Sequence, residues 1–551
     1  MSATPGTVAA TPSPPADLPW LGIFAVLMGA IATTLTSRLT SIGLADVRGA
    51  IGAGFDEGAW IPTAFSAAQM MIGPLAIFLG RVYTPRRVLL AGSVVYGLAE
   101  FLLPLAPNLP TLLFLQVVAG LGSGTFIPLT ASFILTSLPR HLWPWGLAAY
   151  AMNIILGLNL ASSLEGWYVE HATWHWIFWQ NTLVAGPLFL LYWFGLRRLP
   201  VDRDYLRHGD FRGMLLAASG FTLVFIALDQ GDRLDWLSSS LVVALFALGF
   251  VALGLFLLHE SMLDTPSIDF GLLVRRNVVV LIVLVLITRF LVTASNTLVT
   301  NYLIQVRGLR PLEVGNAVLW VALPQLVIAP AVAWMLGRLE PRFAIGTGLA
   351  IAASGFLLAT GITSQWVEGN FSIALLLQAM GETLELTALI YFFGHHLGPA
   401  DGITFGAIIQ TARLFGGQLG TSLIVVFTRK AEQLHSNLIG QHISIGEPDT
   451  TARIAAYARA IGSLSQGAGH AEARGTGLLA AAVRAQSYTL SALDGFLLAS
   501  SVAVLGVGLV LVLREPPVIA NPPAVPPCIR PQPRVRRQRH RVAGASREPV
   551  R

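Results

Sequence analysis

Cysteine and charged residues are both scarce in this sequence. Cys528 is the only cysteine in 551 residues, which excludes disulfides within the chain and cysteine-based metal clusters. Charged residues make up only 12% of the chain, whereas soluble domains usually contain about 25%. Lys430 is the only lysine among 35 basic residues. The arginines lie in short loops between apolar stretches, a pattern that sets membrane topology and gives no indication of nucleic-acid binding.

The sequence contains many long apolar runs. Hydrophobic residues make up 54% of the chain, and the mean hydropathy is +0.67. About 20 apolar residues let a helix cross a hydrocarbon core about 30 Å thick. We therefore predict an all-α polytopic membrane protein. Fourteen runs have about this length, at residues 19–44, 59–79, 88–106, 110–136, 144–168, 177–196, 213–229, 238–258, 278–304, 313–336, 343–363, 370–393, 402–427 and 491–513.

Arginine placement predicts the orientation of these spans. Thirteen arginines lie in the short loops on one side of the predicted membrane, and only four lie in the short loops on the other side. Cytoplasmic loops carry the excess of basic residues in membrane proteins. We therefore predict that both termini are cytoplasmic, which requires an even number of spans.

A repeated motif divides the chain into two halves. Leu79-Gly80-Arg81 with Pro85-Arg86 follows the second span, and Leu336-Gly337-Arg338 with Pro341-Arg342 follows the tenth. If spans 1–6 and 9–14 are equivalent bundles, spans 7 and 8 are an inserted hairpin. Two repeated bundles with a binding site near the membrane midplane form a transporter architecture.

The predicted organisation has five segments and one long outer loop. The loop at 428–490 is interpreted either as an extramembrane helical hairpin or as a flexible loop, because four glycines interrupt its helix-like content. The segments are a cytoplasmic N-terminal tail at 1–18, a six-helix bundle at 19–198, an inserted two-helix hairpin with cytoplasmic linkers at 199–276, a six-helix bundle with the long periplasmic loop at 277–513, and a disordered basic cytoplasmic tail at 514–551.

Polar side chains interrupt the twelfth predicted span in a regular pattern. Gln378, Glu382 and Glu385 fall on one helix face, because their spacings are four and three residues. A charge at the bilayer centre costs about 2.5–3.5 kcal/mol, so such residues usually face protein, water or each other. Glu382 and Glu385 are our candidates for proton coupling, and Gln378 for substrate binding. The alternative is a structural contact between two helices.

Two arginines lie inside spans that are counterparts in the two halves. Arg38 is in the first span and Arg289 in the ninth. A guanidinium cannot lose its proton on burial, so each needs a carboxylate, a carbonyl or water. One interpretation is that they bind an anionic group of the cargo. The other is that they form fixed ion pairs, Arg38 with Glu165 or Glu100, and Arg289 with Glu382 or Glu385.

Four local motifs resemble one family, the fourteen-span drug:proton antiporters of the major facilitator superfamily, of the EmrB/QacA type. The motifs occur in spans 2, 4, 6 and 13: Trp60-Ile-Pro-Thr63-Ala-Phe65, Gly120-Leu-Gly-Ser-Gly124 with Ile127-Pro128-Leu129, Trp174-His-Trp176-Ile-Phe178-Trp-Gln-Asn181, and Arg413-Leu-Phe-Gly416-Gly417-Gln-Leu-Gly420. The resemblance implies the major facilitator fold and export across the inner (plasma) membrane. It also implies work with a periplasmic adaptor and an outer-membrane channel.

The sequence departs from this family at three positions tied to coupling. Thr36 stands where relatives have a first-span aspartate, and Gln116 where they have a fourth-span arginine. The fifth-span antiporter motif is reduced to Ala161-Ser162-Ser-Leu-Glu165-Gly166. Proton coupling is therefore implied by the family and not by these positions. From the motifs we add Gln116 and Arg413 as substrate-binding candidates, and we assign conformational roles to Arg81, Arg86, Gly166, Gly416 and Gly417.

These observations predict a secondary transporter. We expect it to export small amphipathic compounds, anionic or weakly acidic in view of Arg38 and Arg289, in exchange for protons. Its partners are then the cargo, protons, membrane lipid and the adaptor system, with no nucleic acid, cofactor or metal. The alternative is an importer or uniporter of an organic anion, which the reduced fifth-span motif permits. No phosphate loop, metal cluster or nucleophile constellation in the sequence indicates an enzyme.

Overall fold

A computed structural model of the protein is helical throughout the residues that it describes. In this part of the chain, eleven helical segments are long and apolar enough to cross a membrane, judged by length and composition. The described residues are 20–202, 206, 209–263, 275–396, 402–444, 447–461 and 468–514. Apart from Arg514, the tails predicted at 1–18 and 514–551 lie outside these ranges.

Helices coincide with all six spans predicted in the first half. Proline at the first helical position starts α5, and the Asn108 side chain caps α6 by accepting a hydrogen bond from the Thr111 amide at 3.0 Å. The helices are α1 (Trp20–Ile42), α4 (Trp60–Tyr83), α5 (Pro85–Leu102), α6 (Leu109–Ser123) followed by α7 (Phe126–Ser137), α8 (Trp143–His171) and α9 (Trp176–Gly195).

The predicted hairpin consists of α11 (Phe211–Gly231) and α12 (Ser240–Ser261). Asp210 caps α11, since its side chain accepts a hydrogen bond from the Gly213 amide at 2.9 Å. The two helices differ in their surroundings. Large apolar side chains of α12 such as Leu248 and Phe250 are exposed, as expected for a lipid-facing helix, whereas α11 packs against α4 and α19 (Gly402–Gly440).

The second half repeats the pattern. Its tenth span is divided because Pro324 lacks an amide proton and cannot continue α15. Its helices, besides α19, are α14 (Arg276–Gln305), α15 (Pro311–Ala322), α16 (Gln325–Leu336), α17 (Pro341–Ala359), α18 (Ser372–His396), α20 (Pro448–Ile461) and α21 (Ala468–Val510).

The segment predicted as a long loop is largely helical. α19 continues to Gly440, α20 follows, and α21 begins at Ala468, which corresponds to the hairpin alternative. The prediction that glycines break helices here was wrong for those inside α21. A Cβ on Gly475 would lie 2.7 Å from the Ile454 carbonyl oxygen, so glycine at this position lets α20 pack closely on α21.

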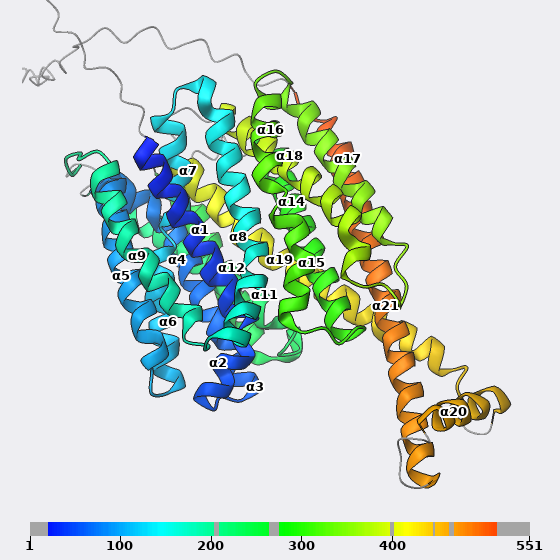
Figure 1. The fold of residues 1–551 in the computed structure, drawn as a ribbon. Coiled ribbons are helices and arrows are strands. Elements are labelled where there is room, and N and C mark those ends of the chain that lie inside the picture. Colours follow the sequence, from blue (N-terminus) through cyan, green and yellow to red (C-terminus); the bar gives the residue numbers. More distant parts are fainter. Residues whose placement is uncertain are drawn as a thin grey trace, which may run out of the picture. The chain divides into compact units, whose positions relative to one another are not determined.

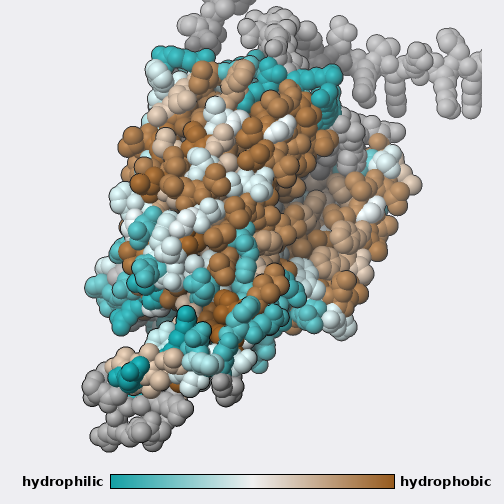
Figure 2. Space-filling view, turned by 90° about the vertical axis from the view of Figure 1, so that its right-hand side faces the viewer, coloured by the Kyte–Doolittle hydropathy of each residue, from teal (hydrophilic) through white to brown (hydrophobic). Residues whose placement is uncertain are grey.

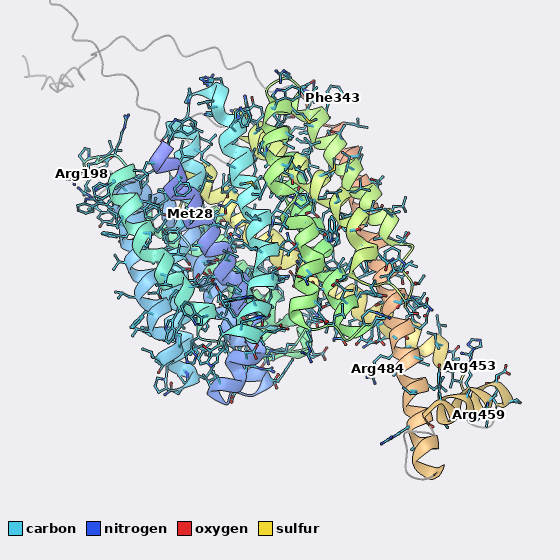
Figure 3. All side chains as sticks on the ribbon, in the orientation of Figure 1. Met28, Arg198, Phe343, Arg453, Arg459 and Arg484 are labelled. Carbon is cyan, nitrogen blue, oxygen red and sulfur yellow. The ribbon has the colours of Figure 1, made fainter. Side chains whose placement is uncertain are left out.

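The helix ends fall on two opposite sides of the bundle. The start of α1 and the end of α21 lie at the same end, and α20 lies at the other (Figure 1). Arg198 lies toward the first end, and Arg453, Arg459 and Arg484 mark the α20 extension (Figure 3). A broad hydrophobic band crosses the face in Figure 2 between more hydrophilic ends. This banding is expected of a surface that faces lipid between two aqueous phases.

Glycines allow α17 and α18 to pack with their backbones in contact. A Cβ on Gly381 would lie 2.5 Å from the Ala352 amide nitrogen and 2.6 Å from the Gly348 carbonyl oxygen. A Cβ on Gly348 would lie 2.6 Å from the Glu385 amide nitrogen. Small residues at such crossings let membrane helices approach closely. The packing fixes the rotation of α18 and thereby the direction of its polar stripe.

We predict that Gly381→Ala destabilises the protein, because backbone atoms of α17 cannot move aside as a flexible side chain would. Overpacking of this kind costs about 1–3 kcal/mol. The measurement is the melting temperature of purified protein in detergent. Gly254→Ala in α12 is the matched control, since its Cβ would meet nothing within 4 Å. Equal melting temperatures for the two variants would contradict the packing argument.

Candidate functional site

A cavity of about 300 Å³ lies between the two halves. Its walls come from α1, α4 and α8 of the first half, α14 and α19 of the second, and α11 of the hairpin. Small-molecule sites have volumes of roughly 300–1,000 Å³. The cavity is therefore large enough for a small ligand, and it lies where two repeated bundles are expected to share a site.

Three arginines reach this cavity from three different helices. Arg38 comes from α1, Arg289 from α14 and Arg413 from α19. Arg289 and Arg413 are buried, with only 6% and 7% of their surfaces exposed, and their charges are close enough to repel each other. Among the described residues, none of the three has a carboxylate within the 4.0 Å of an ion pair.

Arg38 bonds to a neutral amide, not to the glutamates considered as partners. Its Nη2 donates to Asn296 Oδ1 of α14, and Asn296 Nδ2 donates to Asn159 Oδ1 of α8 at 3.3 Å. This chain joins both halves along the cavity wall. Glu100 instead accepts a hydrogen bond from Asn181 Nδ2 at 3.1 Å. The guanidinium of Arg38 therefore has a neutral hydrogen-bond partner, with no carboxylate at ion-pair distance among the described residues.

The glycine motif of α19 accommodates α14 and Arg289. A Cβ on Gly420 would lie 2.9 Å from the Phe290 Cα, and one on Gly416 would lie 3.2 Å from the Arg289 Cβ. A Cβ on Gly417 would lie 3.4 Å from Arg289 Nη2, in ordinary contact. Gly416 and Gly420 thus serve close helix packing, whereas Gly417 leaves space beside the guanidinium. Arg413 Nε donates to Gln410 Oε1 at 3.1 Å.

The polar stripe of α18 faces α14 and is fully enclosed. Ser295 Oγ donates to Gln378 Oε1 at 2.5 Å, and Thr288 Oγ1 lies 2.5 Å from Glu385 Oε1. Glu382 and Glu385 are 1% and 0% exposed. Glu382 Oε1 and Glu385 Oε2 have no hydrogen-bond partner in the described structure. Each carboxyl group therefore has an oxygen free to carry a proton.

The hydrogen bonds of Thr288 depend on whether the other oxygen of Glu385, Oε1, carries a proton. Its Oγ1 lies 2.8 Å from the Leu284 carbonyl oxygen as well as 2.5 Å from Glu385 Oε1. A hydroxyl has one proton to donate. If that proton goes to Leu284, the short contact with Glu385 requires a proton on the carboxyl group. If it goes to Glu385, the carboxylate can be ionised.

The stripe and the cavity contact two faces of one helix. Thr288 and Ser295 of α14, seven residues apart, face α18. Arg289 and Asn296, also seven residues apart, line the cavity. A spacing of seven residues places side chains on the same helix face. A rotation or shift of α14 therefore changes both the carboxyl contacts and the cavity wall.

Two predicted binding residues do not line the cavity. Gln116 of α6 is fully buried, and neither amide atom has a hydrogen-bond partner in the described part of the chain. Gln378 bonds to Ser295, while its Nε2 has no partner there. The structure therefore brings together Arg38, Arg289 and Arg413, but places the two glutamines elsewhere within the bundle.

The reduced motif of the fifth span lies where the halves meet. Ser163 Oγ donates to the Gly315 carbonyl oxygen at 3.1 Å, and a Cβ on Gly315 would lie 2.8 Å from the Ser163 Cα. Gly166 is buried one turn further along α8. The small residues of this motif thus let α8 of the first half cross α15 of the second at close range.

The repeated basic motif has the same contact in both halves. Arg86, at the start of α5, donates through Nη2 to the Trp193 carbonyl oxygen near the end of α9 at 2.9 Å. Arg342, at the start of α17, donates through Nη1 to the Leu513 carbonyl oxygen just beyond α21 at 3.2 Å. Each arginine thus supplies a donor and a positive charge to a helix C-terminus. Arg81, in the last turn of α4, shares this end of the bundle.

We predict that Arg86→Ala destabilises the first half. The variant loses the hydrogen bond to Trp193 and the contact of the guanidinium with its ring, 4.8 Å from the ring centroid. A hydrogen bond to a charged group contributes about 1.5–3 kcal/mol. The melting temperature of Arg86→Ala should fall below that of Arg87→Ala, whose side chain is exposed. A matching loss in both variants would show that Arg86 does not act through this contact.

One cavity residue was missed by the sequence analysis. Asp229 of α11 lines the cavity, and it accepts hydrogen bonds from Thr63 Oγ1 and Gln230 Nε2. The signal was weak, since Asp229 is the last residue of the span predicted at 213–229, where a charge costs less than at the bilayer centre. It was overlooked because spans 7 and 8 were interpreted as an insertion outside the two bundles. In the described residues, no group of three or more His, Cys, Asp or Glu side chains could hold a metal ion.

Comparison with known proteins shows which family this chain matches. A model described as Major Facilitator Superfamily matches residues 26–421, which is more than half of the chain. The chain belongs to the Major Facilitator Superfamily. Membership confirms the predicted fold class and indicates a multi-pass transporter and not an enzyme.

Curated relatives of this superfamily member are named as multidrug export or resistance proteins. Multidrug export protein EmrB of Escherichia coli K12 is 22% identical over 504 residues, covering 89% of this chain and 94% of that protein. Fatty acid resistance protein FarB of Neisseria gonorrhoeae is 24% identical over 432 residues, covering 78% and 84%. Probable multidrug resistance protein EmrY of E. coli K12 is 24% identical over 480 residues, covering 83% and 90%. These matches confirm the resemblance to EmrB-type transporters of the superfamily.

Solved structures agree on the fold. The human organic anion transporter MFSD10 (TETRAN) aligns with a TM-score of 0.55 at 16% identity, covering 90% of this chain and all of that one. The proton:xylose symporter XylE aligns with a TM-score of 0.52 at 12% identity, covering 75% and 90%. At such identities the likeness concerns the superfamily fold alone.

Proposed function

We propose that this superfamily member exports small amphipathic compounds that carry an acidic group, in exchange for protons. The observation that carries this proposal is the convergence of Arg38, Arg289 and Arg413 on one cavity, with no carboxylate at ion-pair distance among the described residues. Buried guanidinium groups are costly unless they are paired. A carboxylate of the cargo supplies the missing partner, and the planar guanidinium suits it.

Proton exchange rests on Glu382 and Glu385. Both carboxyl groups are enclosed, and each has an oxygen without a hydrogen-bond partner in the described structure. For exchange, arrival of the cargo must favour proton release, and its departure must favour proton uptake. α14 couples cargo binding to proton binding, because its Thr288 contacts Glu385 while its Arg289 faces the cargo. Alternating access of the two bundles then exposes the loaded cavity to one side at a time.

We also propose that the transporter works with a periplasmic adaptor and an outer-membrane channel. The outer end of α19, α20 and the start of α21 form a helical extension with exposed Arg453, Arg459 and Arg484. An exposed, basic helical extension can offer a docking surface for such an adaptor. We further propose an inner-membrane location with cytoplasmic termini, which the arginine distribution supports.

The test of cargo charge is a binding measurement on the purified transporter in lipid nanodiscs. Titrating octanoic acid, octanamide and octylamine by calorimetry compares an anion, a neutral amide and a cation of equal chain length. The proposal predicts that the acid binds most tightly and that added salt weakens its binding. Tighter binding of octylamine than of octanoic acid would contradict the role assigned to the arginines.

A further inference from the structure

The inserted helix α11 is part of the wall between the two halves. Ser422 Oγ of α19 donates to the Leu228 carbonyl oxygen at 2.9 Å, and the Phe221 and Phe415 rings meet edge to face with centroids 6.2 Å apart. On its other side, Thr222 Oγ1 lies 3.8 Å from Met71 Sδ of α4. α11 therefore contacts one helix of each half, unlike a peripheral addition.

The outer end of α11 is fixed to both halves by ion pairs. Arg233 Nη1 lies 2.9 Å from Asp56 Oδ1 of α3 (Phe55–Gly58), in the first half. Arg429 Nη2 of α19 lies 2.8 Å from Asp232 Oδ1. These contacts hold the end of α11 that carries Asp229 at a fixed depth in the bundle. The position of Asp229 at the cavity is thus set by packing and by charge.

Asp229 brings a negative charge to a cavity that otherwise has three positive ones. Besides the bonds from Thr63 and Gln230, of which the latter is 3.0 Å long, it has a third side-chain partner in Gln418. All three are neutral and can donate a proton. The positive charge of Arg233 acts on Asp229 from a distance, but among the described residues no cation lies within the 4.0 Å of an ion pair with Asp229. A ligand that approaches this carboxylate from the cavity must therefore offer a cation or a hydrogen-bond donor.

We propose that Asp229 forms an acidic subsite and that the preferred cargo is amphoteric, with a carboxylate for the arginines and an ammonium group for Asp229. This inference rests on the proposed export of acidic compounds and narrows their class. The arginines and Asp229 line one cavity of about 300 Å³, so a single small molecule can reach both. Recognition by charges of both signs selects against simple acids and simple amines.

The test compares octanoic acid with 8-aminooctanoic acid, which differ only in a terminal ammonium group. Binding to the full-length transporter in nanodiscs should be tighter for the amino acid. Asp229→Asn should lower the affinity for 8-aminooctanoic acid by about tenfold or more and should not weaken that for octanoic acid. Asp449→Asn is the matched control, because Asp449 is exposed on α20 and does not line the cavity; its preference should equal that of the wild type.

Three outcomes overturn the acidic subsite. Equal weakening of both ligands by Asp229→Asn would mean that Asp229 only supports the cavity structurally, and no change with either ligand would mean that it does not face the cargo. Loss of ligand-dependent proton flux with both affinities unchanged would make Asp229 a proton site. By contrast, failure of the wild type to bind octanoic acid would contradict the proposed anion transport itself.

Discussion

Replacing Glu382 or Glu385 with glutamine is expected to abolish proton-driven transport while leaving cargo binding intact. Glutamine has nearly the shape of a protonated glutamate but can neither bind nor release a proton at neutral pH. Both side chains are enclosed, so the substitution removes a buried charge without opening a cavity. Each variant should therefore fold, bind octanoic acid as the wild type does, and fail to accumulate it against a gradient.

The measurement is uptake of labelled octanoic acid into inside-out vesicles energised by a pH gradient. Glu170→Gln, at the exposed end of α8, is the matched control and should retain full uptake. Thr288→Val provides a second variant of the same site, because it removes the hydroxyl that contacts Glu385 without changing any charge. If both glutamine variants transport at the wild-type rate, the α18 stripe is structural and the proton path lies elsewhere.

Replacing Arg289 with glutamine is expected to weaken the binding of acidic cargo strongly and selectively. Arg289 is buried, has no carboxylate partner at ion-pair distance among the described residues, and faces the cavity beside Gly417. Losing one partner of a buried, hydrogen-bonded charge pair costs about 2–5 kcal/mol. The lower figure corresponds to roughly a 30-fold increase in the Kd of octanoic acid.

Comparing acid binding with amide binding shows whether Arg289 recognises the cargo charge or only packs α14 against α19. The Kd of octanamide should change little in Arg289→Gln, since a neutral amide gains little from the positive charge. Arg338→Gln is the control, because Arg338 stacks on the Trp334 ring outside the cavity, with its Cζ 3.9 Å from the centroid. Equal losses for acid and amide would show that Arg289 mainly holds α14 against α19.

Apolar run length located the helices well, since crossing a bilayer requires a long apolar segment with internally bonded backbone. The predicted helix boundaries were wrong outside the membrane, where a helix does not need a long apolar segment. There, glycine was taken as a helix breaker, yet Gly475 lies within α21 because α20 packs against it. Local propensity cannot reveal a helix that is stabilised by a neighbour distant in sequence.

The candidate site was only partly accessible to sequence reasoning. Arg38 and Arg289 were recognisable because charges in a membrane are costly and need a purpose. Arg413 was recognisable from its place in a family motif. Gln116 was selected by its place in a family motif. Such a motif does not reveal that the side chain does not line the cavity. Asp229 was missed because the position of an inserted helix depends on contacts between the two halves, and one sequence does not display such contacts.

Ligand-dependent proton movement in proteoliposomes tests the central claim most directly. Purified transporter is reconstituted, a pH gradient is imposed, and internal pH is followed after addition of octanoic acid or octylamine, with protein-free liposomes correcting for passive permeation. The account predicts dissipation that depends on the acid and the protein and that disappears in Glu382→Gln and Glu385→Gln. Dissipation with octylamine alone would contradict anion recognition by the arginines, and no protein-dependent flux with either compound would contradict proton-coupled export.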